Sequence, residues 1–155
     1  SGRMADKLNL QHRQILQPEG DPMAGNGFGI IGELQQPVES ITFLQQVKEI
    51  FRCDRLRYTA PHTPSIQRVA VCGGAGASFF KQALTGRADI YISGDFKYHD
   101  FFLTENRIMI ADIGHYESEQ FTKEIFYEIL TKKYLNLRFS FLRLIQIRLS
   151  TYNIW

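Results

Sequence analysis

Residues 68–74 read RVAVCGG, residues 89–94 read DIYISG and residues 108–114 read IMIADIG. Each stretch holds a short apolar run rich in β-branched residues, and each run ends at a glycine. Such runs are typical of strands that are buried on both faces of a sheet. Helical patterns over residues 76–85 and 97–104 separate the strands. This alternation predicts an α/β fold with a parallel or mixed sheet covered by helices.

The flanking sequence predicts further elements. Ile41, Leu44, Val47 and Phe51 recur at helical spacing, so residues 38–52 are predicted to form an amphipathic helix. The other predicted elements are a helix over residues 3–9, a loop over 18–29, a strand from about 28 to 34, a short strand over 55–59 and one long helix over 116–133.

The composition is that of a globular domain. Of the 155 residues, 44% are hydrophobic and 22% are charged, so the chain is not of the disordered class. A net charge of +2 gives no reason to expect nucleic acid or a membrane surface as a partner. Cys53 and Cys72 have no paired spacing, and no apolar run is long enough to span a membrane. We therefore expect a cytoplasmic protein.

Two glycine-rich stretches need interpretation. Gly27–Gly32 is a literal G-x-G-x-x-G, but a loop precedes it and Pro37 follows too soon for the long helix of a dinucleotide site. A glycine-rich strand is the favoured interpretation. Gly73, Gly74 and Gly76 lie between a strand and a helix, where backbone N–H groups can contact an anion. A tight turn that packs the helix on the sheet explains the same residues.

Polar residues follow the other two buried strands. The strand at 89–94 is directly followed by Asp95, Lys97 and His99. These residues form either part of a functional site or ordinary surface groups. His115 and Glu119 are four apart at the start of a helix, so both side chains project from one face. An imidazole nitrogen and a carboxylate oxygen at this spacing can bind a divalent ion. Acidic residues are also common in a first helical turn for electrostatic reasons.

Several motifs together resemble one family. The segments RVAVCGG at 68–74, GDFKYH at 94–99 and DIGHY at 112–116 are similar to the carboxyl half of the NIF-like dinuclear metal-centre family, whose members are often called GTP cyclohydrolase type two homologues. GIIGEL at 29–34 and GRMADKL at 2–8 resemble the middle of that family. The resemblance runs in order over about residues 2 to 135.

The resemblance implies a three-layer α/β fold of two similar intertwined halves, and hexamers with two divalent metal ions in each subunit. It implies that His115 and Glu119 are metal ligands, and that the other ligands precede Gly2. By the same resemblance, the chain is the carboxyl-terminal portion of such a domain, and we expect an upstream segment. Zinc, iron and manganese all suit a His/Glu site.

Two functions follow as hypotheses. The first is metal-dependent hydrolysis of a small phosphorylated or nucleotide-like substrate, with His115 and Glu119 as ligands. Asp95, Lys97 and His99 would then orient ligands or contact substrate, and Gly73, Gly74 and Gly76 would contact an anion. The second is a metal-stabilised, non-enzymatic interaction or regulatory scaffold. We expect this polypeptide by itself to be inactive, because two ligands leave an ion undersaturated.

The last residues depart from the family. Residues 143–148 show no clean period of 2 or 3.6, and in another reading frame their codons can spell Glu-Val-Asn-Thr-Asn-Pro-Ile, which resembles the usual ending of the family. Residues 143–155 are therefore expected to be a non-native, frameshifted tail, with a divergent native strand over 136–149 as the alternative. The coding DNA decides between these.

Overall fold

The computed structural model describes residues 1–20, 25–134 and 138. The proposed frameshifted tail at 143–155 and the alternative strand at 136–149 lie outside the described residues, apart from Arg138. The chain divides into two compact units, Ser1–Phe121 and Thr122–Trp155, and each is described by itself. No helix in the described part is long and apolar enough to cross a membrane.

The described residues of the first unit form a mixed six-stranded sheet in the order β1-β2-β4-β5-β6-β3. β4, β5 and β6 are parallel, whereas β1 pairs with β2, β2 with β4 and β3 with β6 in antiparallel fashion. In chain order the elements are α1 (Gly2–Lys7), β1 (Gln11–Pro18), β2 (Gly27–Glu39), α2 (Ser40–Ile50), β3 (Arg57–Tyr58), β4 (Ser65–Val71), the 3₁₀ turn η2 (Gly76–Phe79), α3 (Phe80–Thr85), β5 (Ile90–Ser93), the 3₁₀ helix η3 (Tyr98–Thr104), β6 (Met109–Asp112) and α4 (His115–Glu119).

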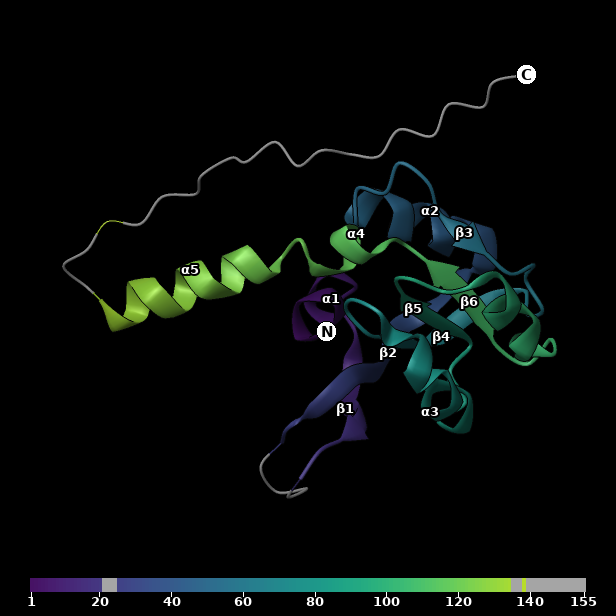
Figure 1. The fold of residues 1–155 in the computed structure, drawn as a ribbon. Coiled ribbons are helices and arrows are strands. Elements are labelled where there is room, and N and C mark those ends of the chain that lie inside the picture. Colours follow the sequence, from purple (N-terminus) through teal and green to yellow (C-terminus); the bar gives the residue numbers. More distant parts are fainter. Residues whose placement is uncertain (21–24, 135–137, 139–155) are drawn as a thin grey trace. The chain divides into compact units, whose positions relative to one another are not determined.

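The predicted α/β fold and its layers are confirmed. Side chains alternate across the central strands, so Val69 and Val71 pack into one core cluster and Ala70 and Cys72 into another. α1 and α2 cover the first cluster, and α3 covers the second (Figure 1). The sheet is therefore the middle of three layers, which is why its strands are apolar on both faces.

Two strands of the sheet differ from the sequence prediction. β1 was not predicted, because its mostly polar, exposed sequence pairs only at the edge of the sheet. The strand predicted to end near residue 34 continues to Glu39, and Pro37 fits because the β2–β4 register is irregular between Glu33 and Val38. Gly27–Gly32 lies within this strand, as predicted.

The single long helix predicted over residues 116–133 is wrong. The structure has α4, which ends at Glu119, and a separate α5 (Thr122–Lys133) in the second unit. Phe121 is buried in the first core cluster, with its ring 5.9 Å from that of Phe51. Gln120 donates a hydrogen bond to the carbonyl of Phe51. These tertiary contacts fix Gln120 and Phe121 between the two helices.

Candidate functional site

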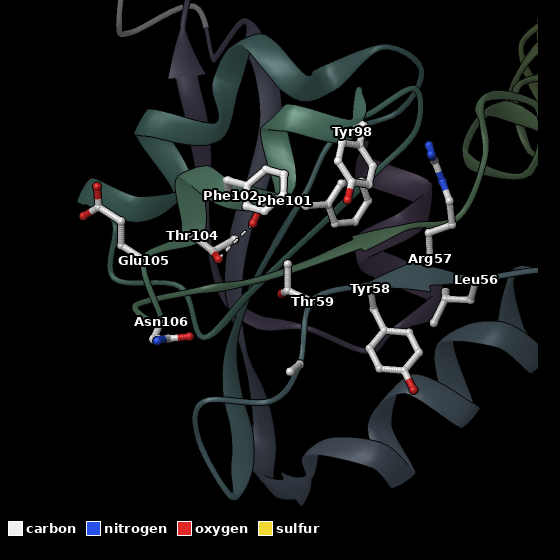
Figure 2. A pocket seen from close by; sticks show the side chains of 11 residues that line it. Leu56, Arg57, Tyr58, Thr59, Tyr98, Phe101, Phe102, Thr104, Glu105 and Asn106 are labelled. Carbon is white, nitrogen blue, oxygen red and sulfur yellow. Dashed lines mark hydrogen bonds between the residues drawn. The ribbon is translucent and has the colours of Figure 1, made fainter.

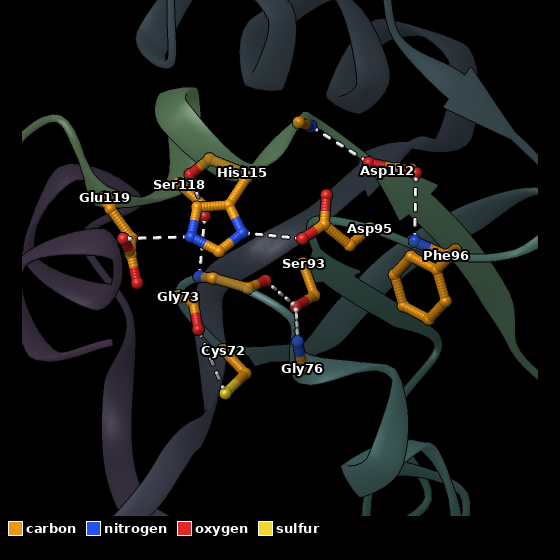
Figure 3. A network of polar contacts seen from close by, with 12 residues as sticks. Cys72, Gly73, Gly76, Ser93, Asp95, Phe96, Asp112, His115, Ser118 and Glu119 are labelled. Atoms are coloured by element: carbon orange, nitrogen blue, oxygen red, sulfur yellow. Dashed lines mark hydrogen bonds and ion pairs between the residues drawn. The ribbon is translucent and has the colours of Figure 1, made fainter.

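The carboxyl ends of β5 and β6 bring Asp95 and His115 together. Ser93 pairs with Asp112 in the parallel ladder, so the residues that follow both strands emerge at the same edge of the sheet. Nδ1 of His115 lies 2.6 Å from Oδ2 of Asp95. On the other side of the ring, Nε2 lies 3.2 Å from Oε2 of Glu119, one turn along α4 (Figure 3). The imidazole is thus held between two carboxylates.

Both carboxylates favour the protonated imidazole. The hydrogen bond to Asp95 is the main cause that raises the pKa of His115 above 6.5; burial opposes it, and the charges of Asp95 and Glu119 add to the increase. All three side chains are about half exposed, so solvent screens these charges. A metal ion at Nε2 would have to displace this proton.

We expect Asp95→Asn to lower the pKa of His115, because the neutral amide no longer stabilises the imidazolium. The measurement is an NMR titration of the imidazole resonances in chelator-treated protein. The raised folded-state pKa stabilises the wild-type chain below about pH 6.5, and this contribution is lost as the pH rises through the folded-state pKa. An unchanged His115 pKa in Asp95→Asn would contradict the assigned cause.

Glycines allow the backbone to approach this cluster. A Cβ on Gly94 would lie 2.8 Å from the carbonyl carbon of Gly114 and from the amide nitrogen of His115. A Cβ on Gly74 would lie 2.5 Å from Oε1 of Glu119, and Gly74 also has a left-handed φ of +70°. The turn after β4 and the end of β5 therefore lie directly against the residues that carry the candidate ligands.

The amides of the glycine turn already have protein partners. Gly73 donates to Oγ of Ser1, Gly74 to Oγ of Ser118 at 2.8 Å, and Gly76 to the carbonyl of Gly74 and to Oγ of Ser93. An anion at this turn would have to replace one of these oxygens. The Ser118 hydroxyl also donates to the carbonyl of His115, so it ties the turn to α4.

Asp112 holds the two loops of the site in place. Its side chain is only 3% exposed, and its Oδ1 accepts from the amide of Gly114 at 2.9 Å. Its Oδ2 accepts from the amide of Phe96 at 3.2 Å and from the guanidinium of Arg57. The sequence motif at 112–116 did not predict this role, although a carboxylate within an otherwise apolar strand is a signal for one.

Lys97 and His99 make their contacts at η3. The Lys97 amide donates to the carboxylate of Asp100 at the start of η3. Nε2 of His99 lies 3.6 Å from Oδ1 of the same Asp100. In the described part of the chain, no hydrogen bond or ion pair joins either residue to His115. Their predicted role in substrate contact stays a prediction.

The cluster offers few donors for a metal ion. Within residues 1–20, 25–134 and 138, no three His, Cys, Asp or Glu side chains are placed to bind one ion. His115 and Glu119 point their donor atoms at each other, and Asp95 occupies the other ring nitrogen. The donor types, an imidazole nitrogen and a carboxylate, suit a divalent ion. Their number is enough for only part of a coordination sphere.

Comparisons with known proteins agree on one family. The Duf34/NIF3 (NGG1p interacting factor 3) family model matches residues 1–148. A "GTP cyclohydrolase 1 type 2 homolog" of Streptococcus pneumoniae is 37% identical over 123 residues, which cover 76% of this chain and 45% of the relative. A protein of the same name from Staphylococcus epidermidis is 37% identical over 107 residues, 68% of this chain and 29% of the relative. The chain thus spans less than half the length of these curated relatives.

Solved structures show the same fold. The Bacillus cereus protein related to NIF3 superposes with a TM-score of 0.67 at 27% identity, over 81% of this chain and 36% of that protein. Reduced HcgD from Methanocaldococcus jannaschii superposes with a TM-score of 0.65 at 26% identity, over 86% of this chain and 50% of that protein.

Proposed function

This chain belongs to the Duf34/NIF3 family, and we propose that it supplies part of a two-metal, hydrolase-type site for a nucleotide-like or phosphorylated small molecule. The observation that carries the proposal is the His115 imidazole, held between the carboxylates of Asp95 and Glu119. The name of the Streptococcus pneumoniae relative, "GTP cyclohydrolase 1 type 2 homolog", supports the nucleotide-like class of substrate.

In this proposal, Nε2 of His115 and the carboxylate of Glu119 would hold a divalent ion such as zinc, iron or manganese. When bound, such ions would lower the pKa of a water molecule and polarise the substrate. Asp95 keeps the remaining imidazole proton on Nδ1, which leaves the Nε2 lone pair free for a ligand bond. Gly74 leaves room for the Glu119 carboxylate beside the turn after β4.

The other ligands belong to the proposal as well. Because the described part of this chain places no third donor beside His115 and Glu119, we propose that they come from a segment preceding Gly2 in a longer protein. The hexamer and the cytoplasmic location expected from the sequence remain part of the same proposal.

The test is an assay of the full-length, metal-loaded protein against a panel of nucleotides and phosphoesters. We expect turnover of at least one substrate, which is lost after chelation and in His115→Ala. His12→Ala is the matched control, because His12 is exposed on the edge strand β1, which β2 and β4 separate from the strands that carry the site. A protein that keeps its metal and turns over nothing would favour the scaffold function over the hydrolase.

A further inference from the structure

A hollow in the surface lies between the edge strand β3 and η3. Its volume is about 770 Å³, within the usual range for small-molecule pockets. We call it the β3–η3 cleft (Figure 2). The lining residues that matter below are Arg57, Tyr58, Tyr98, Phe101, Phe102 and Asn106. None of the described residues that line it is His115, Asp95 or Glu119.

The cleft presents aromatic rings to solvent. Tyr98 is 79% exposed, Phe102 is 68% exposed and Tyr58 is 48% exposed. The rings of Tyr98 and Phe102 meet edge to face, with their centroids 5.4 Å apart. Apolar surface left in water costs free energy, and clustered exposed aromatic rings mark binding sites. Flat rings favour a flat partner, because a planar molecule contacts them over a large area with little loss of entropy.

Arg57 adds a cation with open donors to the same cleft. Its Nη2 donates to the carbonyl of Phe96 at 2.8 Å and to Asp112, and its guanidinium carbon lies 5.5 Å from the centre of the Phe101 ring. Its Nε and Nη1 have no partner among the described residues, and the side chain is 58% exposed. The guanidinium is therefore held in place and still has N–H groups for an anion.

The other charged and polar groups of the cleft do not prevent Arg57 from binding an anion. The carboxylate of Glu105 pairs with Arg107 at 2.7 Å, so its charge is balanced outside the cleft. Asp112 is almost fully buried behind Arg57, and both its oxygens are occupied by hydrogen bonds. Asn106 can donate or accept a further hydrogen bond.

We propose that the β3–η3 cleft binds a planar aromatic molecule that carries an anionic group. The ring system lies against Tyr98 and Phe102, and the anion accepts hydrogen bonds from Nε and Nη1 of Arg57. A carboxylate and a phosphate satisfy the same donors, so the shared chemistry is that of an aromatic oxyanion. The proposal does not rest on the metal site, because it requires no metal and none of its ligands.

The test uses 2-naphthoate and 2-naphthyl phosphate as probes, with 2-naphthamide as the neutral analogue and cyclohexanecarboxylate as the non-aromatic anion. Binding is followed by amide chemical-shift changes in NMR spectra of the full 155-residue chain in the presence of a chelator. We expect saturable changes confined to residues 56–60 and 98–106. Both analogues should bind at least about fivefold more weakly than 2-naphthoate, since each lacks one of the two interactions. The probe with the higher affinity identifies the preferred oxyanion.

Variants test the two halves of the site separately. Phe102→Ser should weaken 2-naphthoate binding by at least about fivefold. Phe126→Ser is its matched control, because Phe126 is 61% exposed on α5 and lines no part of the cleft. Arg57→Lys keeps a cation near Asp112 but loses the planar fork, so it should reduce the preference for 2-naphthoate over 2-naphthamide. The melting temperature of each variant shows whether it is folded.

Three outcomes would overturn the proposal. The first is the absence of saturable shifts at β3 and η3 in the folded wild-type chain. The second is equal affinity for 2-naphthoate and 2-naphthamide. The third is self-association of the chain, seen by sedimentation, that Phe102→Ser abolishes while probe binding is absent. That result would assign the aromatic rings to an interface between copies of this chain.

Discussion

His115→Ala should remove nearly all bound divalent metal from the full-length protein. The substitution deletes the nitrogen ligand and leaves Glu119 as the single donor of this pair. We expect the affinity to fall by more than about a hundredfold, beyond the roughly 10- to 100-fold cost of losing an outer hydrogen-bond partner of a ligand. Glu119→Ala should behave in the same way. Elemental analysis of the purified variants measures the metal content.

Controls separate the ligand role from a loss of folding. Asp95→Asn should weaken metal binding less than His115→Ala does. It disturbs the orientation of the imidazole ring but leaves this ligand in place. His12→Ala should keep the metal content of the wild type. Far-UV circular dichroism should be unchanged throughout, since His115 and Glu119 are half exposed. Normal metal content in both His115→Ala and Glu119→Ala would refute the assignment of these ligands.

The isolated 155-residue chain provides a further comparison for the same site. With two donors from this pair, it should bind divalent metal far more weakly than the full-length protein. Titration calorimetry with zinc and manganese measures the difference. Tight, stoichiometric uptake of two ions by this chain alone would contradict the proposal that the remaining ligands come from another segment.

Asp112→Ala should destabilise the fold by about 2–4 kcal/mol, because it removes a buried, charged acceptor that three donors share. The amides of Phe96 and Gly114 would lose their partner, and the loops that carry Asp95 and His115 would no longer be held together. Urea unfolding measures the loss of stability. The pKa of His115 should also fall toward 6.5, because its contact with Asp95 depends on those loops.

Asp112→Asn tests the same carboxylate without creating a cavity. The side-chain amide group would face N–H donors on either side of the residue, so we expect a clear loss of stability here too. Glu105→Gln is the matched control, since Glu105 forms an exposed pair with Arg107. That pair should contribute no more than about 1 kcal/mol. Equal stability of Asp112→Asn and Glu105→Gln would show that Asp112 does not hold the loops.

The sequence predicted those helices and strands whose formation depends on the pattern of neighbouring residues. The apolar runs ending at Cys72, Ser93 and Ile113 predicted the central parallel strands, because side chains buried on both faces must be apolar throughout. The four-residue spacing of His115 and Glu119 predicted that they share a helix face, because the helical repeat fixes that geometry locally. Motif resemblance then predicted the family, which the comparisons confirm.

Tertiary structure alone decided how separate segments meet. The sequence placed Asp95, Lys97 and His99 in one group, but the strand register brings Asp95 to His115, whereas the Lys97 amide and the His99 ring contact Asp100 in η3. β1 forms only because β2 offers an edge to its polar sequence. Burial of Phe121 against Phe51 separates α4 from α5. Each of these contacts joins residues distant in sequence, so its free energy appears only once the chain has folded, and no local pattern encodes it.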